Sequence, residues 1–284
     1  MKRTKYQILN SLGQGKFGNV YRGIHQKTGE EVAIKLEPAS LNTPHLLKHE
    51  STMLHYLYSK SCRDVPPVHW FGEWIHENVA HVGLVMPLYE CSLHQWASSY
   101  PTAKEDLIPG FMRRILPIYQ GIHREGVIHR DVKPQNIMFH RGDWKIIDFG
   151  LATFYVDDQF RHIPATTTPH VHLVGTPKYA SRNVHDGYDS TRRDDLISLG
   201  YVVLFLLYGD RMWDTTRGVT DTRCGYEPTH ILYPNNLRLR ECKSLENLRP
   251  RLPFSLYSYF ECVYSLTFSQ TPDYTQLVSI WSTV

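Results

Sequence analysis

The sequence predicts an α+β fold with two lobes, formed by one domain over residues 1–284. Short strand-like runs dominate from residue 6 to about residue 86, interrupted by one helical segment, and helical patterns dominate from Ser92 onward. With 42% hydrophobic and 21% charged residues, the composition is that of a globular protein. The expected parts are a β-rich lobe over about 1–86, a hinge over 87–90 and a helical lobe over 91–284.

A glycine-rich string, Gly13-Gln14-Gly15-Lys16-Phe17-Gly18-Asn19-Val20, lies between the first two expected strands. The pattern G-x-G-x-x-G alone is weak, because dinucleotide-binding folds use it at a strand-to-helix turn. Here strand-like runs flank the string on both sides, and no long apolar-periodic helix opens after Gly18. The glycines are therefore expected in a hairpin whose backbone N–H groups close over phosphates. An ordinary glycine-rich hairpin is the alternative.

A lysine follows in the string Val32-Ala33-Ile34-Lys35. Its ammonium group would need a carboxylate to hold it against the α- and β-phosphates of a nucleotide. The segment 44–60 is expected to be a helix with Thr43 as its N-cap, because its apolar residues follow helical spacing. Glu50 is the one acidic residue in that segment and is the expected partner of Lys35. A solvated helix glutamate is the alternative.

Two strings downstream carry residues suited to phosphoryl transfer. A helix expected over 111–124 leads into His129-Arg130-Asp131-Val132-Lys133-Pro134-Gln135-Asn136, and Ile147-Asp148-Phe149-Gly150 follows. They supply a general base (Asp131), a cation for phosphate (Lys133) and two oxygen ligands for magnesium (Asn136 and Asp148). This is the set needed to move the γ-phosphoryl group of ATP onto a hydroxyl. Together with the two upstream strings, they resemble the protein kinases.

That resemblance implies a bilobal kinase fold, ATP and Mg²⁺ as cofactors, and proteins as substrates. It places Met86 behind the adenine and the backbone of Leu88 to Tyr89 at the edge of the base. Pro87 lacks a backbone N–H and would stiffen the hinge. The expected nucleotide-binding residues are Leu12, Gly13, Gln14, Gly15, Lys16, Phe17, Gly18, Asn19, Val20, Ala33, Lys35, Met86, Leu88, Tyr89 and Met138.

The segment beyond the second string resembles the casein kinase I family more specifically. Its strings are Gly175-Thr176-Pro177-Lys178-Tyr179-Ala180, Ser181-Arg182-Asn183 in place of the usual A-P-E, and Arg192-Arg193-Asp194-Asp195. The resemblance covers essentially the whole chain. It implies serine or threonine acceptors, substrate positioning by Thr176 and Lys178, and a brace under the catalytic loop by Asp195. Taken alone, Asp194-Asp195 would indicate a solvated turn.

The sequence also departs from that family. The family commonly recognises acidic or phosphorylated residues near the acceptor through cations, and Lys178 keeps one such charge. The stretch 165–172 has no lysine or arginine, and the later cations are scattered at Arg217, Arg223, Arg238, Arg240 and Lys243. We therefore expect a shallow preference for acidic or phosphorylated peptides. Lys178 and Arg182 have no obvious acidic partner in the sequence, so they are expected to be open to an anion.

Two other classes of protein stay open. A pseudokinase scaffold would share the fold and lack the chemistry, but the complete set Lys35, Glu50, Asp131, Asn136 and Asp148 argues against it. A small-molecule kinase would share the catalytic strings. It would not be expected to keep the peptide-positioning segment at 175–176 or the helix that carries the brace.

Charge, hydropathy and cysteines limit the partners. The net charge of +3 is too small to indicate nucleic-acid binding, and the longest apolar run, 201–208, is far shorter than the roughly 20 residues of a membrane span. The N-terminus lacks the apolar segment of a signal peptide, and the five cysteines show no C-x-x-C pairing. We expect a monomer with reduced thiols in the cytoplasm or the nucleus, bound to neither nucleic acid nor membrane.

Overall fold

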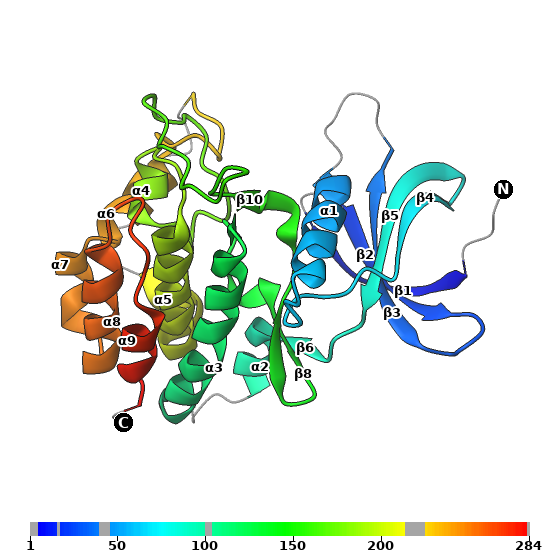
Figure 1. The fold of residues 1–284 in the computed structure, drawn as a ribbon, viewed down its shortest axis with the longest axis horizontal. Coiled ribbons are helices and arrows are strands. Elements are labelled where there is room, and N and C mark those ends of the chain that lie inside the picture. The colour runs from blue at the N-terminus through cyan, green and yellow to red at the C-terminus, as the bar shows by residue number, and fades with distance from the viewer. Residues whose placement is uncertain (1–4, 16–17, 40–45, 100–103, 214–224, 283–284) are drawn as a thin grey trace. The chain divides into compact units, whose positions relative to one another are not determined.

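The chain forms two compact units in a computed structural model that describes residues 5–15, 18–39, 46–99, 104–213 and 225–282 (Figure 1). Unit 1 comprises residues 1–92 and 138–151, and unit 2 comprises residues 93–137 and 152–284. Residues 138–151 thus belong to unit 1 although they follow part of unit 2 in the sequence.

Unit 1 contains an antiparallel sheet of five strands in the order β1-β2-β3-β5-β4. The strands are β1 (Tyr6–Gly15), β2 (Gly18–His25), β3 (Glu31–Pro38), β4 (Trp70–His76) and β5 (Val79–Pro87). On β3, Val32, Ile34 and Leu36 are buried in the core of the sheet. Because side chains alternate along a strand, Ala33 and Lys35 point to the opposite face.

Helix α1 (Leu46–Ser59) packs against β3 and β5 of that sheet (Figure 1). Its buried residues include Leu47, Glu50, Leu54 and Leu57, spaced three and four apart as one face of a helix requires. Glu50 is therefore a buried residue on an apolar face, and the alternative of a solvated glutamate is wrong. The expected N-cap, Thr43, lies outside the described residues.

The rest of unit 1 is a small sheet and a short helical turn. The strands β6 (Cys91–Ser92), β8 (Ile137–His140) and β9 (Asp143–Ile146) pair in the order β6-β8-β9. The 3₁₀ turn η2 (Phe149–Leu151) follows and packs against α1. This contact brings the end of the Asp148 string next to the helix that carries Glu50.

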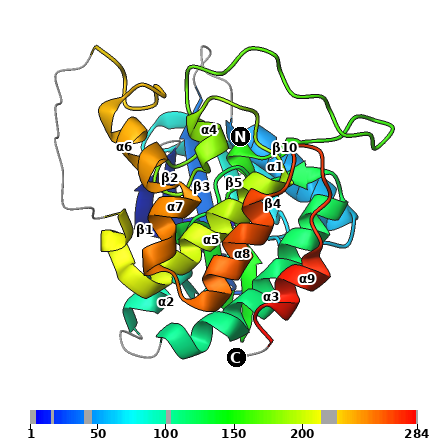
Figure 2. The same cartoon turned by 90° about the vertical axis from the view of Figure 1, so that its left-hand side faces the viewer.

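Unit 2 is helical and is built around α5 (Arg192–Tyr208), which packs against α8 (Phe254–Tyr264) and α3 (Lys104–Arg124) (Figure 2). The sequence predicts a helix over 111–124, and the observed α3 begins earlier, at Lys104. The added turns contain Pro109, a residue type that is disfavoured in a helix interior.

The remaining elements of unit 2 are short, except α6. They are α2 (Leu93–Ser99), β7 (Val127–Ile128), η1 (Pro134–Asn136), β10 (Thr153–Phe154), α4 (Arg182–His185), η3 (Gly209–Trp213), α6 (Pro234–Cys242), α7 (Leu245–Leu248), η4 (Arg249–Arg251) and α9 (Tyr274–Ser279). The pair β7 and β10 is antiparallel, and α9 packs on α3.

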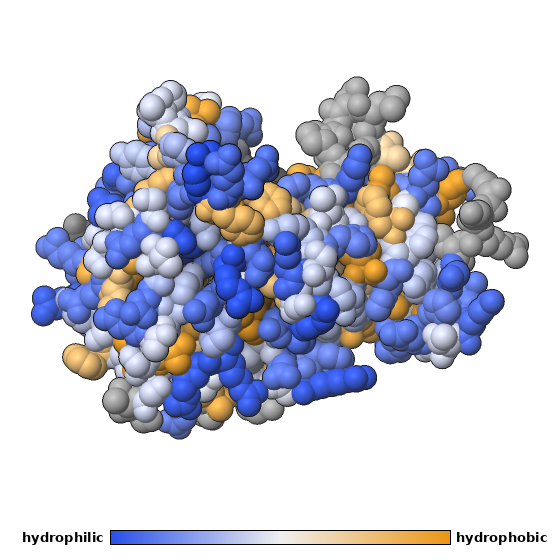
Figure 3. Space-filling model, viewed as in Figure 1, coloured by the Kyte–Doolittle hydropathy of each residue, from blue (hydrophilic) through white to orange (hydrophobic). Residues whose placement is uncertain are grey.

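Helix α5 belongs to an apolar helical segment that is longer than the apolar run 201–208. Together with η3 it spans Arg192–Trp213, 22 residues that are long and apolar enough to cross a membrane by length and composition. The run 201–208 taken alone did not indicate an apolar segment of this length. All residues from Asp194 to Leu206 are buried within unit 2, and a buried core helix passes the same test. On the face of each unit seen in Figure 3, hydrophobic side chains are scattered among hydrophilic ones.

Candidate active site

In unit 1, Lys35 joins two carboxylates. Its Nζ lies 2.7 Å from Glu50 Oε2 and 2.8 Å from Asp148 Oδ1. The lysine comes from β3, Glu50 from α1, and Asp148 from the turn before η2. The Glu50 side chain is 1% exposed, whereas that of Asp148 is 28% exposed. The pairing of Lys35 with Glu50 expected from the sequence is present, and a second partner is added.

Burial and the neighbouring charges together shift the pKa values of this cluster. Burial alone would lower the pKa of Lys35, but Glu50 and Asp148 outweigh it and raise that pKa. Burial raises the pKa of Glu50, and the ammonium group of Lys35 only partly offsets this, because the nearby Asp148 acts with burial. Lys35 thus stays a cation shared between two anions.

The backbone at Asp148 is unusual. Its φ is 66°, the left-handed region that residues other than glycine seldom adopt. Such conformations cost energy and gather at functional turns. This one leaves the Asp148 carboxylate on a partly exposed turn, with Oδ1 on Lys35. A partly exposed carboxylate is a suitable oxygen ligand for Mg²⁺.

The glycine string forms the end of the β1–β2 hairpin, as expected, with Gly15 opposite Gly18. Gly18 has a φ of 150°, and a Cβ there would lie 2.2 Å from the Leu36 carbonyl oxygen. Only glycine fits this approach of two strands. Lys16 and Phe17, expected to bind nucleotide, lie outside the described residues.

The other expected nucleotide-binding residues are also in unit 1. Met86 on β5 is buried and pairs with Ala33 on β3, while Pro87 ends β5 opposite Val32. Leu88 and Tyr89 follow the strand and are half-buried. Met138 lies on β8 beside Ser92 of β6, and Leu12, Asn19 and Val20 lie in the hairpin.

In unit 2, three expected residues meet at Asp131. Lys133 Nζ donates to Asp131 Oδ2 at 2.6 Å, and the Thr176 hydroxyl donates to Oδ1 at 2.7 Å. Lys133 Nζ also lies 3.2 Å from Thr176 Oγ1. Asn136 Nδ2 donates to the Asp131 carbonyl oxygen at 3.0 Å. The Asp131 carboxylate is buried, so these donors fix its position.

The orientation of Asn136 matters for metal binding. Its amide nitrogen is directed at Asp131, with a second contact of 3.3 Å to Oδ2. The amide oxygen is therefore the atom left to act as a ligand, and oxygen is the donor that Mg²⁺ prefers. Within the described residues, no group of three or more His, Cys, Asp or Glu side chains is arranged to hold a metal ion.

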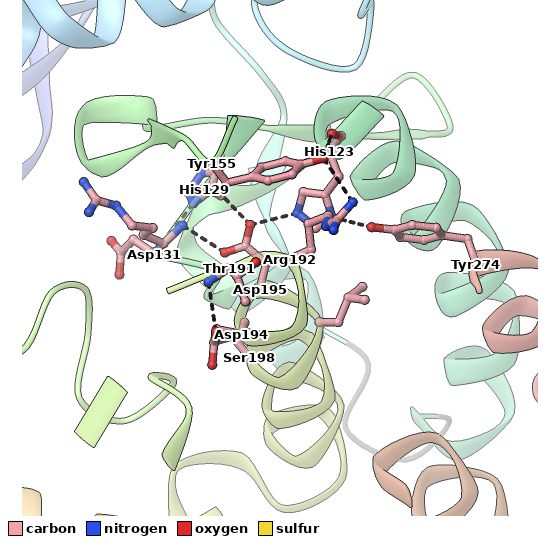
Figure 4. Close-up of polar contacts among 12 residues, drawn as sticks. His123, His129, Asp131, Tyr155, Thr191, Arg192, Asp194, Asp195, Ser198 and Tyr274 are labelled. Atoms are coloured by element: carbon pink, nitrogen blue, oxygen red, sulfur yellow. Dashed lines mark hydrogen bonds and ion pairs between the residues drawn. The ribbon is translucent and has the colours of Figure 1, made fainter. Parts of the chain in front are cut away.

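Asp195, in the first turn of α5, supports the loop of residues 129–136 from within the core (Figure 4). Its Oδ2 accepts the His129 N–H at 2.7 Å, and its Oδ1 accepts the Arg130 N–H at 2.9 Å. His123 Nε2 lies 3.0 Å from Oδ2. Burial would raise the pKa of Asp195, but the hydrogen bonds from His123 and His129 outweigh burial and lower it.

The neighbouring Asp194 is also buried, but its hydrogen bonds stabilise the start of α5. It caps the start of α5: its carboxylate accepts the Thr191 N–H at 2.9 Å in a capping box (Figure 4). Ser181 and Asn183, from the string that replaces A-P-E, also donate to Asp194. The prediction of a solvated turn, which this pair of aspartates would support if taken alone, is wrong.

His123, which lies on α3, was not predicted to have a role. Besides contacting Asp195, its Nδ1 lies within hydrogen-bonding distance of the Tyr274 hydroxyl, and its carbonyl accepts the Tyr155 hydroxyl at 2.6 Å (Figure 4). These partners are up to 151 residues away along the chain. No local spacing could have indicated them.

Gly175 allows the segment with Thr176 to lie against the catalytic loop. Its φ is 93°, and a Cβ there would lie 2.4 Å from the Arg130 carbonyl oxygen. Arg130 itself has a φ of 65°. Only glycine permits this close approach of the two backbones at Gly175.

The expectation that Lys178 has no acidic partner is wrong. Its Nζ donates to Asp210 Oδ1 on η3 at 2.7 Å. Asp210 is 32 residues further along the chain, so inspection of neighbouring residues could not find it. This hydrogen bond lowers the pKa of Asp210. Arg182 is exposed at the start of α4, and Arg217 and Arg223 lie outside the described residues.

The antiparallel N-terminal sheet, the helical C-terminal part and the two carboxylate clusters define a class of phosphotransferase. A sequence model of the protein kinase domain matches residues 6–248, well over half of the chain. The chain belongs to the protein kinase family. The bilobal kinase fold expected from the sequence is thereby confirmed.

Proposed function

We propose that this protein kinase transfers the γ-phosphoryl group of Mg-ATP to serine and threonine hydroxyls of proteins, in the manner of the casein kinase I family. The observation that carries the proposal is the meeting of Lys133, Thr176 and Asn136 at the buried Asp131 carboxylate. A lysine two residues after the base, together with a threonine on the following segment, is the pattern of serine/threonine kinases.

Residues of unit 1 bind the nucleotide in this proposal. Lys35 holds the α- and β-phosphates because Glu50, buried on α1, fixes its ammonium group. The hairpin residues supply backbone N–H groups, and the strand end at Met86 to Tyr89 meets the base. Bound Mg²⁺ would offset the negative charge of the phosphates, with Asp148 and Asn136 as its protein ligands.

The chemistry at Asp131 follows from its contacts. Asp131 Oδ1 can accept a second hydrogen bond beside the one from Thr176, so Asp131 can receive the acceptor hydroxyl without losing Thr176. Asp131 takes the hydroxyl proton as the oxygen bonds to the γ-phosphorus and ADP leaves. Lys133, already on Asp131, is placed to offset charge on the transferred group.

The test of acceptor chemistry uses one peptide frame with serine, threonine or tyrosine at the acceptor position. With labelled ATP and Mg²⁺, we expect transfer to serine and threonine and none above background to tyrosine. Transfer to tyrosine at a comparable rate would contradict the serine/threonine assignment. Labelling of small metabolites with no peptide labelled would instead support a small-molecule kinase.

We propose a shallow preference for acidic or phosphorylated peptides. Lys178 supplies the attractive charge, but it already pairs with Asp210, and a phosphate of about −1.5 to −2 charges needs opposing cations to bind tightly. The preference should fade as salt rises, because the pair is near the surface. The test compares kcat/KM for serine, phosphoserine and lysine upstream of the acceptor at low and high salt. A preference for lysine would contradict it.

A pseudokinase scaffold is the alternative function. Its fold would be the same, so the decisive observation is whether ADP is produced with any protein substrate.

We further propose that the protein acts as a monomer in the cytoplasm or nucleus, without nucleic-acid or membrane partners. We expect its cysteines to be reduced there.

A further inference from the structure

A lysine is buried in the core of unit 2 with no carboxylate beside it. Lys243 follows α6 and is 0% exposed. Its Nζ lies 2.6 Å from the Pro177 carbonyl oxygen, 2.6 Å from the Ala180 carbonyl oxygen and 3.0 Å from His185 Nε2. Among the residues that the structure describes, it forms no ion pair.

This burial is costly unless the amine is fully hydrogen-bonded. An isolated buried ammonium group is strongly disfavoured, and burial accordingly lowers the pKa of Lys243. Burial also lowers the pKa of His185 to about 3, with Lys243 acting in the same sense. Two carbonyl oxygens and one imidazole nitrogen take up the three positions around Nζ. The rings of Tyr201 and Trp213 lie 5.1 Å and 5.3 Å from it.

The carbonyl groups that Lys243 binds belong to one turn, residues 176–180. Within the turn, the Tyr179 and Ala180 N–H groups donate to the Thr176 carbonyl oxygen at 2.8 Å and 3.0 Å. From outside, Trp213 Nε1 donates to the Lys178 carbonyl oxygen at 2.9 Å. Lys243 and Trp213 thus donate to three carbonyl oxygens of the turn and hold it at several points. The Pro177 carbonyl oxygen also lies 3.1 Å from His185 Nε2.

The same turn carries the Thr176 hydroxyl, 2.7 Å from Asp131 Oδ1. The turn therefore connects a contact at the base with anchors in the core. Figure 2 shows α6, which precedes Lys243, beside α4, and the two helices are in contact. A shift of the turn by a fraction of the hydrogen-bond length would move the Thr176 hydroxyl away from Asp131, and small misplacements near a reacting group are costly.

We infer that Lys243 is a positioning residue for phosphoryl transfer: it clamps the turn at 176–180 so that Thr176 stays on the Asp131 carboxylate. The inference rests on the proposed function, since its readout is transfer to a peptide. Lys243 does not touch the reacting groups. It acts through Thr176, with Trp213 as a second and weaker anchor.

The first test is Lys243→Met, which keeps most of the side-chain volume and removes the N–H donors. We expect kcat for peptide phosphorylation to fall by about tenfold or more, as for other losses of orientation at a reacting group. The KM for ATP should stay within about twofold, because the proposed nucleotide-binding residues are in unit 1. Amide hydrogen exchange at Tyr179 and Ala180 should speed up, which is a readout independent of activity.

The matched control is Ile115→Ala, a core truncation in α3 of the same unit with no part in the turn. It should lower Tm while leaving kcat nearly unchanged. A double-mutant cycle then separates positioning from general destabilisation: in a Thr176→Val background, Lys243→Met should cost little further activity. Equal losses in both backgrounds would overturn the inference and make Lys243 a structural residue.

The outcomes also separate the two proposals. An active wild type with an equally active Lys243→Met variant would overturn the inference and leave the proposed function standing. A wild type without transfer would overturn the proposed function itself. If Lys243→Met does not fold, Trp213→Phe decides, because it removes the Nε1–H donor while keeping an aromatic ring at the position; a partial loss of kcat with unchanged KM for ATP is expected, and an unchanged kcat would overturn the inference.

Discussion

Each unit contains a buried carboxylate, and the pKa values of these two carboxylates are shifted in opposite directions. In unit 1, Glu50 meets the ammonium group of Lys35, which it shares with Asp148, and burial still raises its pKa. In unit 2, Asp195 accepts two backbone N–H groups and contacts His123, and its pKa is lowered despite burial. Both side chains are almost fully buried, at 1% and 2% exposure.

The difference shows what each cluster can do. A single cation shared by two anions forms a pair that can rearrange when a third anion, such as phosphate, arrives. Several fixed N–H donors around one carboxylate form a brace whose geometry resists change. Unit 1 therefore presents an exchangeable charge, and unit 2 a rigid support for the loop that carries Asp131.

The most damaging change should be at the brace. Asp195→Ala leaves the N–H groups of His129 and Arg130 buried without an acceptor, which should lower the free energy of unfolding by about 3 kcal/mol. Urea unfolding measures this, with Asp143→Asn, an exposed aspartate in unit 1, as the control. A loss no larger than that of the control would mean that the brace contributes no stability.

Glu50→Gln should affect activity far more than stability. The amide keeps an oxygen for Lys35, which also retains Asp148, and burying an amide costs less than burying a carboxylate. We expect kcat/KM for ATP to fall by about 100-fold, because Lys35 is no longer fixed by charge, with a change in unfolding free energy below about 1 kcal/mol. A large loss of stability would mean that Glu50 is a brace like Asp195.

The pH dependence of stability should differ between the two carboxylates. The folded-state pKa of Glu50 is raised, so the folded chain holds that proton to higher pH than the unfolded chain. The contribution of Glu50 to stability therefore falls as pH rises from about 4.3, its unfolded value, through the raised pKa. For Asp195, whose pKa is lowered, stability is lost only as pH falls below about 3.9.

Unfolding free energies of the wild type and Glu50→Gln, measured across this range, check the sign. The variant should gain stability relative to the wild type as pH rises. A constant difference between the two proteins would show that Glu50 titrates in the folded state as it does in the unfolded state, and the contrast with Asp195 would fail.

The smallest effect should come from the surface pair of Lys178 and Asp210. Asp210→Asn releases Lys178 for an acidic peptide, so kcat/KM for acidic peptides should rise by about two- to fivefold at low salt, as expected of an exposed ion pair. A neutral peptide should be unaffected, and Asp158→Asn, at an exposed aspartate, serves as the control. No gain with the acidic peptide would mean that Lys178 does not bind the substrate.

The sequence predicted those parts of the molecule whose residues lie within one string or one strand. The strings were enough to predict the pairing of Lys35 with Glu50 and to place Lys133 in the same loop as Asp131, where the two are in contact. The contact of Asp148 with Lys35 was not predicted. The first turns of α3 were not predicted: they contain Pro109, and proline is disfavoured in a helix interior.

Contacts between distant segments could not be predicted in the same way. His123 is joined to Tyr274, and Lys243 to the turn at 176–180, by packing of helices far apart in the sequence. Lys243 was noted only as one scattered cation, although it is fully buried. Residue type gave no sign of this, because a lysine is ordinarily a surface residue.

We propose that Asp131, held by the support in unit 2, is the base for phosphoryl transfer in this protein kinase. The most direct measurement is transfer of labelled phosphate from ATP to a serine peptide by the wild type and by Asp131→Asn, with unfolding curves of both. The variant keeps the shape of the side chain but loses its charge. We predict that it folds like the wild type and retains no more than a few per cent of the turnover; a folded variant with clearly higher turnover would contradict the account.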